Sequence, residues 1–258
     1  MNLLALDTST NTMSLAVQRG DAAWEHSGEG GAQASAALIP AIQALMQQAG
    51  LEFAQLHVIV FGAGPGSFTG LRTACSVAQG LGFGAGVPVL AVPTLLAVAD
   101  EARHCTGARR IVAALDARMD EVYAAHYDFD SKQTPFDAGY QLIAPEKLEI
   151  PPGFVLAGNA YAVYGSRIAM GTAFEPRVTL AEAGDAAPVV EQVAALPTAA
   201  ALLRLAPALM AAGLALPAEQ AMPLYIRDKV AKTTLEREAE KRLAASITNS
   251  TQNSTTPP

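Results

Sequence analysis

The chain has 258 residues, of which 51% are hydrophobic and 16% are charged, and its formal net charge is −7. This length and composition predict a globular protein with a large core, and an acidic chain without a basic block is a poor nucleic-acid binder by itself. The two cysteines form no CxxC pair, which excludes a zinc or redox motif and favours a reducing compartment.

No membrane or secretory segment is expected. Asp7 follows only a few apolar residues, too early for a signal peptide. The stretch between Arg72 and Asp100 carries no charge and is long enough to cross a bilayer, but glycines and prolines interrupt it. We read it as a helix end, a short strand at Pro88–Val92 and a new helix from Thr94, in a cytoplasmic protein.

The first residues predict a β-meander. The apolar run Leu3–Leu6 is typical of a buried strand, and Met13–Val17 alternates as a half-buried strand does. Between them, the side chains of Asp7–Thr12 can hydrogen-bond nearby backbone groups in a turn. A third strand is expected at Ala22–His26.

A helix and a buried strand follow. The helix has one apolar face at helical spacing, formed by Leu38, Ile42, Leu45, Met46 and Ala49. Pro40 should kink it near its start, and Gly50 is a natural residue beyond its end. The strand Val58–Phe61 then leads into the sequence GAGPGSFTG.

Two interpretations of this glycine loop stay open: a phosphate cradle and a turn shaped by packing. A P-loop needs the pattern GxxxxGK[ST], and the loop has no lysine. A dinucleotide fingerprint would need glycine where Ser67 stands. Ser67 is a suitable N-cap for the next helix, and an anion there would gain only about 0.3–1 kcal/mol from the helix dipole.

The helix after the loop has a stripe of small and apolar residues: Leu71, Ala74, Cys75, Ala78 and Gly82. The stripe fits tight packing against the chain's own first helix, and it equally fits docking of a partner helix. If a partner docks there, replacing Ala78 with Trp should break that contact and leave the fold largely intact.

The second half repeats the layout of the first. LLALD (3–7) and VAALD (112–116) are apolar strands that end in Ala-Leu-Asp and are followed by a polar turn and another strand. We interpret this as an internal duplication, and the layout predicts an α/β protein with the actin-like, Hsp70-like (ASKHA) fold: two lobes with mixed β-sheets flanked by helices. In that architecture the two hairpins grip nucleotide phosphates between the lobes.

We expect an N-terminal lobe at 1–107, a C-terminal lobe at 108–216, a segment with a charged helix at 217–245 and a disordered tail at 246–258. Within the C-terminal lobe, Val155–Gly165 predicts strand, turn and helix, and Thr198–Ala212 predicts an apolar helix. The charged helix would carry the i,i+4 pairs Asp228–Lys232 and Glu238–Arg242.

Asp7 and Asp116 are the candidate nucleotide-binding residues. In a phosphotransferase of this architecture they would coordinate Mg²⁺ through water or act as a base, although Asp also commonly caps a hairpin turn. Thr8 and Ser9 add hydroxyls suited to phosphate, whereas the turn after Asp116 has no glycine. We therefore expect a vestigial nucleotide site in a pseudo-enzyme, with no catalytic residue.

Metal and triad chemistry have little support. No two of the four histidines are four residues apart, and there is no HExxH motif: His26, His57, His104 and His126. Ser67 lacks the GxSxG pattern of a nucleophilic serine. No metal and no resident cofactor are expected.

Five segments together resemble the bacterial TsaB family, also called YeaZ: LLALDTSTNTMSLAV, GAGPGSFTGLRTACSVAQGL, PVLAVPTL, ALDARMDEVYAAHY and MPLYIRDKVA. The resemblance spans Met1 to about Ala231, and its most specific part is the motif loop: Gly64, Pro65, Gly66, Ser67, Phe68, Thr69, Gly70 and Arg72. It implies a non-catalytic, actin-like paralogue of the transferase TsaD. Proteins of this family dimerise with TsaD and, with the ATPase TsaE, help to place threonylcarbamoyl on the adenosine next to the tRNA anticodon.

We accordingly expect the helices Leu38–Ala49 and Phe68–Phe83 to offer a docking surface to a TsaD-like transferase or to a second copy of this chain. The expected interface residues are Leu38, Ile42, Leu45, Leu71, Ala74, Cys75, Ala78 and Gly82. A TsaE-like ATPase is a further partner, tRNA is met only through the complex, and the partner junction is a place where ATP or ADP could bind. Two alternatives remain: a stand-alone ATP-dependent phosphotransferase and a protease.

The chain departs from the family in two places. Many members have His before Ser or Thr ahead of the first helix, where Ala34 and Ser35 stand here. We therefore assign that loop no polar recognition role. The family usually ends soon after the PxYxR pattern, matched by Pro223–Arg227, but this chain continues.

Overall fold

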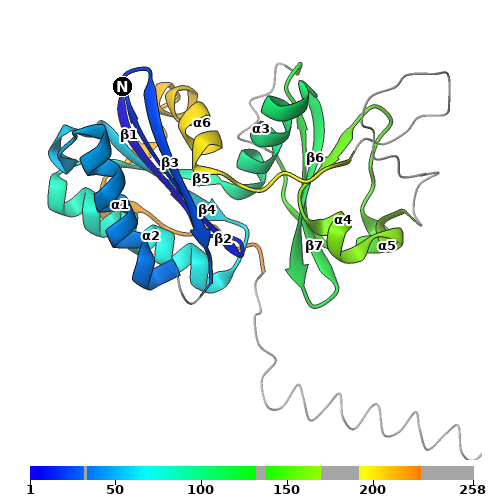
Figure 1. Ribbon diagram of the computed structural model, residues 1–258. Coiled ribbons are helices and arrows are strands. Elements are labelled where there is room, and N and C mark those ends of the chain that lie inside the picture. The colour runs from blue at the N-terminus through cyan, green and yellow to red at the C-terminus, as the bar shows by residue number, and fades with distance from the viewer. Residues whose placement is uncertain (32–33, 132–137, 170–191, 228–258) are drawn as a thin grey trace, which may run out of the picture. The chain divides into compact units, whose positions relative to one another are not determined.

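The strands form two sheets (Figure 1), and the strands of both sheets are arranged in the same spatial order relative to their order in the sequence. The computed structural model describes residues 1–31, 34–131, 138–169 and 192–227. The first sheet has the order β11-β5-β4-β1-β2-β3, from β1 (Asn2–Asp7), β2 (Thr12–Arg19), β3 (Ala22–Glu29), β4 (Val58–Gly64), β5 (Val89–Pro93) and β11 (Ala215–Leu216). The second has the order β10-β9-β6-β7-β8, from β6 (Arg110–Arg118), β7 (Glu121–Asp128), β8 (Gln141–Ile143), β9 (Val155–Ala157) and β10 (Gln192–Val193).

The pairing of these strands confirms the predicted duplication. β1 pairs antiparallel with β2 and parallel with β4, just as β6 pairs antiparallel with β7 and parallel with β9. Each sheet continues with a further antiparallel strand, β3 or β8, and a further parallel strand, β5 or β10. The chain therefore has the actin-like α/β fold, with two mixed sheets flanked by helices.

Helices cover both faces of the first sheet. α1 (Ala34–Ala49) contacts β2 and β3, and α2 (Phe68–Ala85) contacts β4 and β1. α6 (Ala199–Ala211) contacts β1, β2, β4 and β5 from the other face. Such a double cover suits β1, whose alternate side chains divide between the two faces: Leu4 and Leu6 belong to the core with α1 and α2, and Leu3 and Ala5 to the core with α6.

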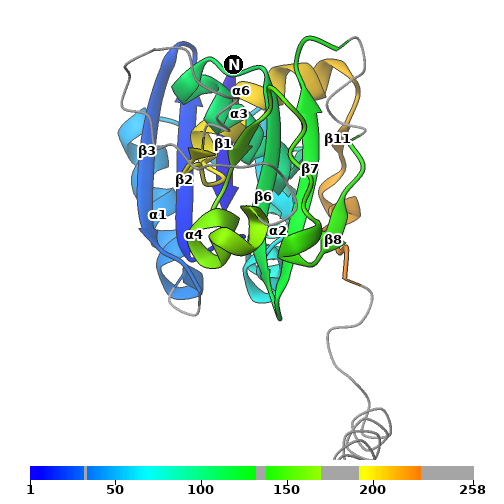
Figure 2. The same cartoon turned by 90° about the vertical axis from the view of Figure 1, so that its right-hand side faces the viewer.

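The second sheet is covered by shorter elements on one side. α3 (Thr94–Thr106) contacts β6 and also α6. α4 (Ala160–Tyr164) and α5 (Ser166–Ala169) bring Ala160 and Ile168 into a separate apolar cluster, and Figure 2 shows α4 in front of this sheet. Short 3-10 helices lie at η1 (Phe53–Gln55), η3 (Pro145–Lys147) and η4 (Ala218–Gln220).

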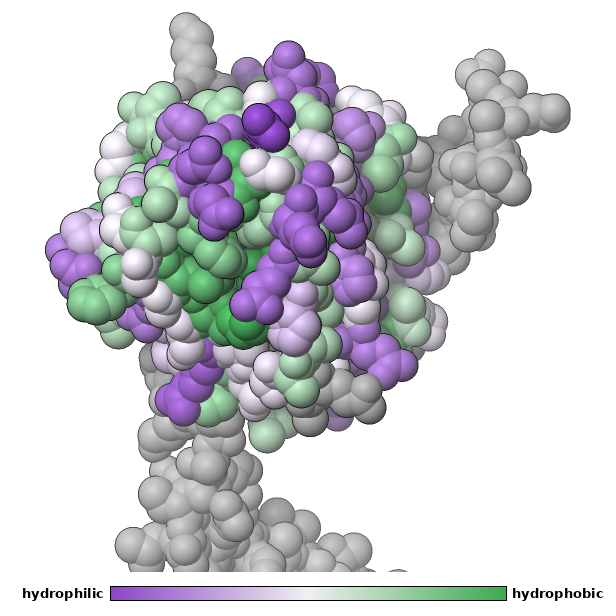
Figure 3. Space-filling model, turned by 60° about the vertical axis from the view of Figure 1, so that its left-hand side comes forward, coloured by the Kyte–Doolittle hydropathy of each residue, from purple (hydrophilic) through white to green (hydrophobic). Residues whose placement is uncertain are grey.

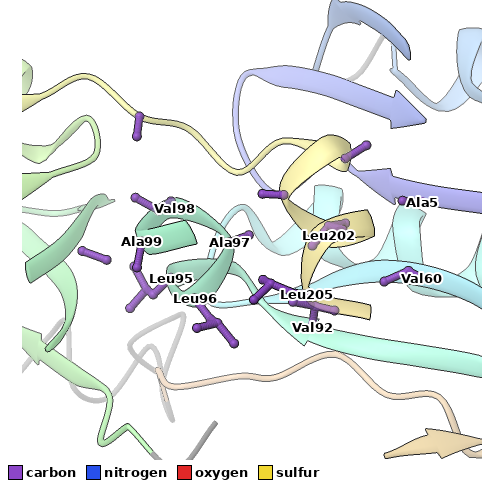
Figure 4. Close-up of a cluster of buried hydrophobic side chains, with 14 of the residues drawn as sticks. Ala5, Val60, Val92, Leu95, Leu96, Ala97, Val98, Ala99, Leu202 and Leu205 are labelled. Atoms are coloured by element: carbon purple, nitrogen blue, oxygen red, sulfur yellow. The ribbon is translucent and has the colours of Figure 1, made fainter. Parts of the chain in front are cut away.

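One apolar cluster takes side chains from both sheets and from α3 and α6. Figure 4 shows this cluster, to which α3 contributes Leu95 and Leu96 and α6 contributes Leu202 and Leu205. These helices therefore join the two halves of the duplication through aliphatic packing.

A buried ion-pair network also ties α3 to α6. The Asp100 carboxylate is fully buried, and it contacts Arg204 of α6 at 2.7 Å and Arg103 at 2.6 Å. Arg204 also contacts Glu101 at 2.6 Å, and Thr198, the N-cap of α6, donates to the same carboxylate at 2.7 Å. Because these bonds satisfy a carboxylate that has left water, losing one partner should be costly.

The structure divides the chain differently from the predicted lobe boundaries. The boundary at residue 216 assigns α6 and β11 to the C-terminal lobe, but both pack on the first sheet, because that sheet is apolar on both faces and needs a second cover. Residues Met1–Ile226 form one compact unit and Arg227–Pro258 another. The predicted charged helix, its ion pairs Asp228–Lys232 and Glu238–Arg242, and the tail lie outside the described residues.

Replacing Arg204 with Ala should lower the free energy of unfolding by about 2–3 kcal/mol, because Asp100 keeps one cationic partner and Glu101 loses its ion pair. Chemical denaturation followed by circular dichroism measures the change. Arg109→Ala is the matched control, since its ion pair with Asp130 is exposed on both sides and should be worth less than about 1 kcal/mol. Equal losses in the two variants would contradict the role given to the network.

Candidate functional site

The loop between β4 and α2 folds against the turn that follows β1. The backbone N–H of Ser67 donates to the Ser9 carbonyl at 2.8 Å, and the Thr8 hydroxyl donates to the Gly70 carbonyl at 2.7 Å. A Cβ on Gly70 would overlap the Thr8 carbonyl oxygen, and one on Gly66 would lie 2.6 Å from the Ser9 carbonyl oxygen. The space beside these glycines is filled by the chain's own backbone, so the geometry favours the packing interpretation over the phosphate cradle.

Asp7 lies under this contact with its carboxylate fully buried. Oδ1 accepts hydrogen bonds from the Ser9 backbone N–H at 2.9 Å and from the Ser9 hydroxyl at 2.7 Å. Oδ2 has no hydrogen-bond partner in the described part of the chain, and a Cβ on Gly62 would overlap it. Burial raises the pKa of Asp7 to about 6, against the lowering effect of the two bonds from Ser9.

The three predicted nucleotide-binding residues of the first hairpin therefore point inward. Thr8 and Ser9 are buried like Asp7, and their hydroxyls are used in bonds to Gly70 and to Asp7. None of these three side chains is presented to a ligand as the vestigial-site prediction required.

Asp116 lies two residues before the end of β6, at the position equivalent to Asp7, and makes the same local contact, with the Arg118 N–H donating to its Oδ1 at 2.8 Å. The Tyr164 hydroxyl donates to the same oxygen at 2.7 Å, and the Arg118 guanidinium lies 3.4 Å from Oδ2. Partial burial, and after it the bond to Asp116, raise the pKa of Tyr164 to about 12. Each Asp is committed to its own hairpin, in different sheets, and among the described residues no hydrogen bond joins the two.

The residues expected to form the partner interface are buried within the chain: Leu38, Ile42, Leu45, Leu71, Ala74, Cys75, Ala78 and Gly82. They face the first sheet, because a sheet of aliphatic side chains needs an apolar helix face over it. The expectation that these side chains face a partner is therefore corrected, as is the expectation for Ala78→Trp. Ala78 has no exposed surface, and an indole there would overpack the core.

The surface that α1 and α2 present is the opposite side of each helix. On α2 it comprises Phe68, Thr69, Arg72, Ser76, Gly80, Phe83 and Gly84, and on α1 Ser35, Ala36, Ala37, Ile39, Pro40, Gln43, Ala44, Gln47 and Gln48. Figure 3, in which the side carrying these helices comes forward, shows apolar surface bordered by polar side chains. We call these residues the helix face.

Two features show that the C-terminal part of the helix face packs little against the rest of the described chain. Phe83 is 79% exposed, the largest exposed fraction among the large hydrophobic residues described. A Cβ on Gly80 or on Gly84 would meet no atom within 4 Å. In the sequence, this surface corresponds to the residues of α2 that lie outside the buried stripe. Several of these residues are also small, and for that reason they looked like residues that pack inside the chain.

Residues 221–226, which we call the C-terminal strap, form hydrogen bonds with α2 and with the end of β4. The Gln79 side chain donates to the Ala221 carbonyl at 2.9 Å, and the Leu224 N–H donates to the Ala63 carbonyl at 2.7 Å. A Cβ on Gly64 would lie 2.6 Å from the Leu224 carbonyl oxygen. The strap therefore uses another glycine of the motif loop for close approach.

The strap also completes a cluster at the exposed start of α2. The Arg72 guanidinium lies 4.0 Å from the centroid of the Phe68 ring, and its Nε donates to the Tyr225 hydroxyl at 3.1 Å. The rings of Phe68 and Tyr225 are 5.5 Å apart, and these side chains are 41% and 45% exposed. We call these three residues the arginine cluster.

Within the described residues, no three His, Cys, Asp or Glu side chains are grouped so that they could hold a metal ion. In the same part of the chain, no helix has both the length and the apolar composition that crossing a bilayer requires. His57 accepts a hydrogen bond from the Asn2 backbone N–H, and His126 contacts the Glu149 carbonyl. Both rings therefore contribute to structural hydrogen bonds with the backbone.

Comparison with known proteins decides the family. A family model described as TsaD, tRNA N6-adenosine threonylcarbamoyltransferase, matches residues 29–235. The tRNA threonylcarbamoyladenosine biosynthesis protein TsaB of Escherichia coli K12 is 31% identical over 231 residues, which are 90% of this chain and 96% of that protein. This chain belongs to the TsaB family, also called YeaZ.

Further TsaB proteins support this assignment. TsaB of Haemophilus influenzae is 38% identical over 143 residues, which are 55% of this chain and 60% of that protein. The solved structure of YeaZ from Pseudomonas aeruginosa superposes with a TM-score of 0.72 at 35% identity, covering 87% of this chain and 99% of that one.

In this TsaB chain the motif loop has two sides. Gly64 is buried against the strap and Gly70 against the β1–β2 turn, and Pro65 is also buried, whereas Phe68, Thr69 and Arg72 are exposed on the helix face. The loop thus both anchors α2 and places polar and aromatic groups at the surface.

Replacing Gly70 with Ala should lower the free energy of unfolding by about 3 kcal/mol or more, because its Cβ would overlap the backbone of Thr8. Gly80→Ala, in the same helix, should raise stability by about 0.5–1 kcal/mol, since its Cβ meets open space and Ala is the better helix former. Thermal and urea unfolding of both variants measure these effects. Similar effects of the two substitutions would contradict the close approach described above.

Asp7→Asn should stabilise the protein at pH 7.5 by about 1–2 kcal/mol and have no such effect at pH 4. The pKa of Asp7 is raised from 3.8 to about 6 in the folded protein. The free energy of unfolding therefore decreases as pH rises from about 4 to 6 and stays lower above that range. Unfolding free energies of wild type and variant across pH 4–8 test this, with Asp21→Asn in an exposed turn as control. A difference between wild type and Asp7→Asn that stays constant with pH would rule it out.

Proposed function

We propose that this chain serves the synthesis of threonylcarbamoyladenosine in tRNA as a docking subunit without catalytic residues of its own. Its place in this modification comes from its membership of the TsaB family, whose curated members are named for it. The finer part of the proposal is that it binds and activates a TsaD-like transferase, together with a TsaE-like ATPase. The helix face is the observation that carries the docking role.

The helix face has the composition of a protein interface. Exposed apolar surface rimmed by polar groups typically marks a site of interaction, and a stable contact buries about 800 Å² per partner. Phe83 supplies a large exposed anchor, and Gly80 and Gly84 allow a partner backbone to come close. α1 contributes no charged residue that would have to be desolvated.

The first hairpin supports assigning the chemistry to the partner. Asp7, Thr8 and Ser9 form hydrogen bonds inside the chain, so a stand-alone phosphotransferase is not what we propose. With a net charge of −7, the chain would meet tRNA through the complex rather than by its own surface. A second copy of the chain could occupy the same helix face in the absence of the transferase subunit.

Phe83→Glu should weaken binding of the TsaD-like subunit from the same organism by at least about tenfold, because it removes an exposed anchor and places a charge in the contact. Isothermal titration measures the affinity, and the same variant should lose stimulation of threonylcarbamoyl transfer to tRNA in a reconstituted assay. Val163→Glu is the matched control, because Val163 is an exposed apolar residue on α4, which packs beside the second sheet.

Thermal unfolding of Phe83→Glu should match wild type, because the side chain contributes little to the core. Wild-type affinity in Phe83→Glu would place the docking surface elsewhere. No binding of the transferase subunit by the wild-type chain would refute the docking proposal as a whole.

A further inference from the structure

The charges of the helix face are unevenly distributed. α1 and α2 together carry one charged side chain, Arg72. No Asp or Glu occurs between Glu29 and Glu52, and none occurs between Glu52 and Asp100, although the whole chain has 24 acidic residues. An acidic protein thus has one face with a single cation and no helix-borne carboxylate to neutralise it.

Arg72 lies on the helix face itself. Phe68, Arg72, Ser76, Gly80 and Phe83 are exposed and recur at the three- and four-residue spacing of one helical side. A partner that covers Gly80 and Phe83 along this stripe would extend towards Arg72 within three turns of helix. Arg72 would then be at least partly removed from water.

The guanidinium is already held in position. The Phe68 ring supports one of its faces, and Nε is used in the bond to Tyr225, which leaves the two terminal nitrogens directed elsewhere. In the described part of the chain, no carboxylate forms an ion pair with Arg72. A guanidinium held in this way loses little further conformational entropy when it forms a bidentate bond.

We infer that Arg72 is the electrostatic anchor of the helix face and receives a carboxylate from the partner protein. This inference rests on the proposed docking function. Covering Arg72 without an anion would leave a desolvated, unpaired charge, which costs several kcal/mol. A carboxylate matches the two terminal nitrogens of the fork, and no acidic side chain on α1 or α2 can supply it.

The same reasoning gives Arg72 a part in partner choice. A second copy that docked through its own α1 and α2 would bring another Arg72 and no carboxylate from those helices. A different protein with an Asp or Glu opposite Arg72 would satisfy the charge. Arg72 therefore favours a heterologous partner over self-association through this face.

The test compares binding of the TsaD-like subunit to wild type and to Arg72→Gln by isothermal titration at about 50 and 300 mM NaCl. Wild-type binding should weaken with salt. Arg72→Gln should bind at least about tenfold more weakly at low salt and should lose most of the salt dependence. Arg109→Gln, which removes an exposed arginine from the residue just before β6, is the matched control and should behave as wild type.

Two further variants separate positioning from charge. Tyr225→Phe removes the hydroxyl that orients Arg72 and should weaken binding by a few-fold while keeping the salt dependence. Arg72→Lys keeps the charge but loses the fork, and should fall between wild type and Arg72→Gln. Sedimentation of the chain alone should show self-association of Arg72→Gln that is equal to or stronger than that of wild type.

Failure of this inference is distinguishable from failure of the docking proposal. If Phe83→Glu abolishes binding but Arg72→Gln keeps wild-type affinity and salt dependence, the carboxylate anchor is refuted and docking stands. If the wild-type chain does not bind the subunit, both fall. If Arg72→Gln leaves subunit affinity unchanged but weakens binding of tRNA to the assembled complex, the anion is an RNA phosphate and the carboxylate inference is overturned.

Discussion

The close approach between the β1–β2 turn and the first turn of α2 is the contact on which the rest of the N-terminal half depends. Carbonyl oxygens of Thr8 and Ser9 occupy the space that Cβ atoms would take at Gly70 and Gly66. Hydrogen bonds from Ser67 and from the Thr8 hydroxyl fix the same two segments. Because backbone meets backbone here, the axis of α2 is set relative to β1 without long, adjustable side chains. One face of the helix is thereby committed to the sheet and the other to the surface.

Much of the fold could be predicted because its signals are local. Continuous apolar runs such as Leu3–Leu6 mark strands buried on both faces, and the repeated Ala-Leu-Asp followed by a turn revealed the duplication. The side of α2 that packs inward could not be predicted in the same way. Periodicity shows that a helix has an apolar face but not what covers it, and the small residues on both sides of α2 made a core stripe resemble an interface.

Long-range contacts explain the other differences. α6 follows the second sheet in the sequence but covers the first, because four strands of that sheet need a helix on their second face. The sequence predicted Asp7 as a nucleotide-binding residue, because a carboxylate at the end of a strand is suited to binding Mg²⁺ and phosphate. Its burial depends on Gly62 from a distant strand, which single-sequence patterns do not reveal. The equivalent Asp116 received a tyrosine and an arginine as partners, so the two copies kept the turn and diverged in what surrounds it.

The C-terminal strap links these observations to the surface. Tyr225 reaches the start of α2 only because Leu224 is bonded to Ala63 beside the end of β4, where Gly64 leaves room for the strap. The arginine cluster is therefore assembled from the motif loop and from the last described residues of the compact unit. A chain folded as far as α6 would have the helices and the buried stripe, but Arg72 would lack the hydroxyl that orients it. The arginine cluster is thus complete only after the strap has packed beside α2, which ties the orientation of Arg72 to the last residues of the compact unit.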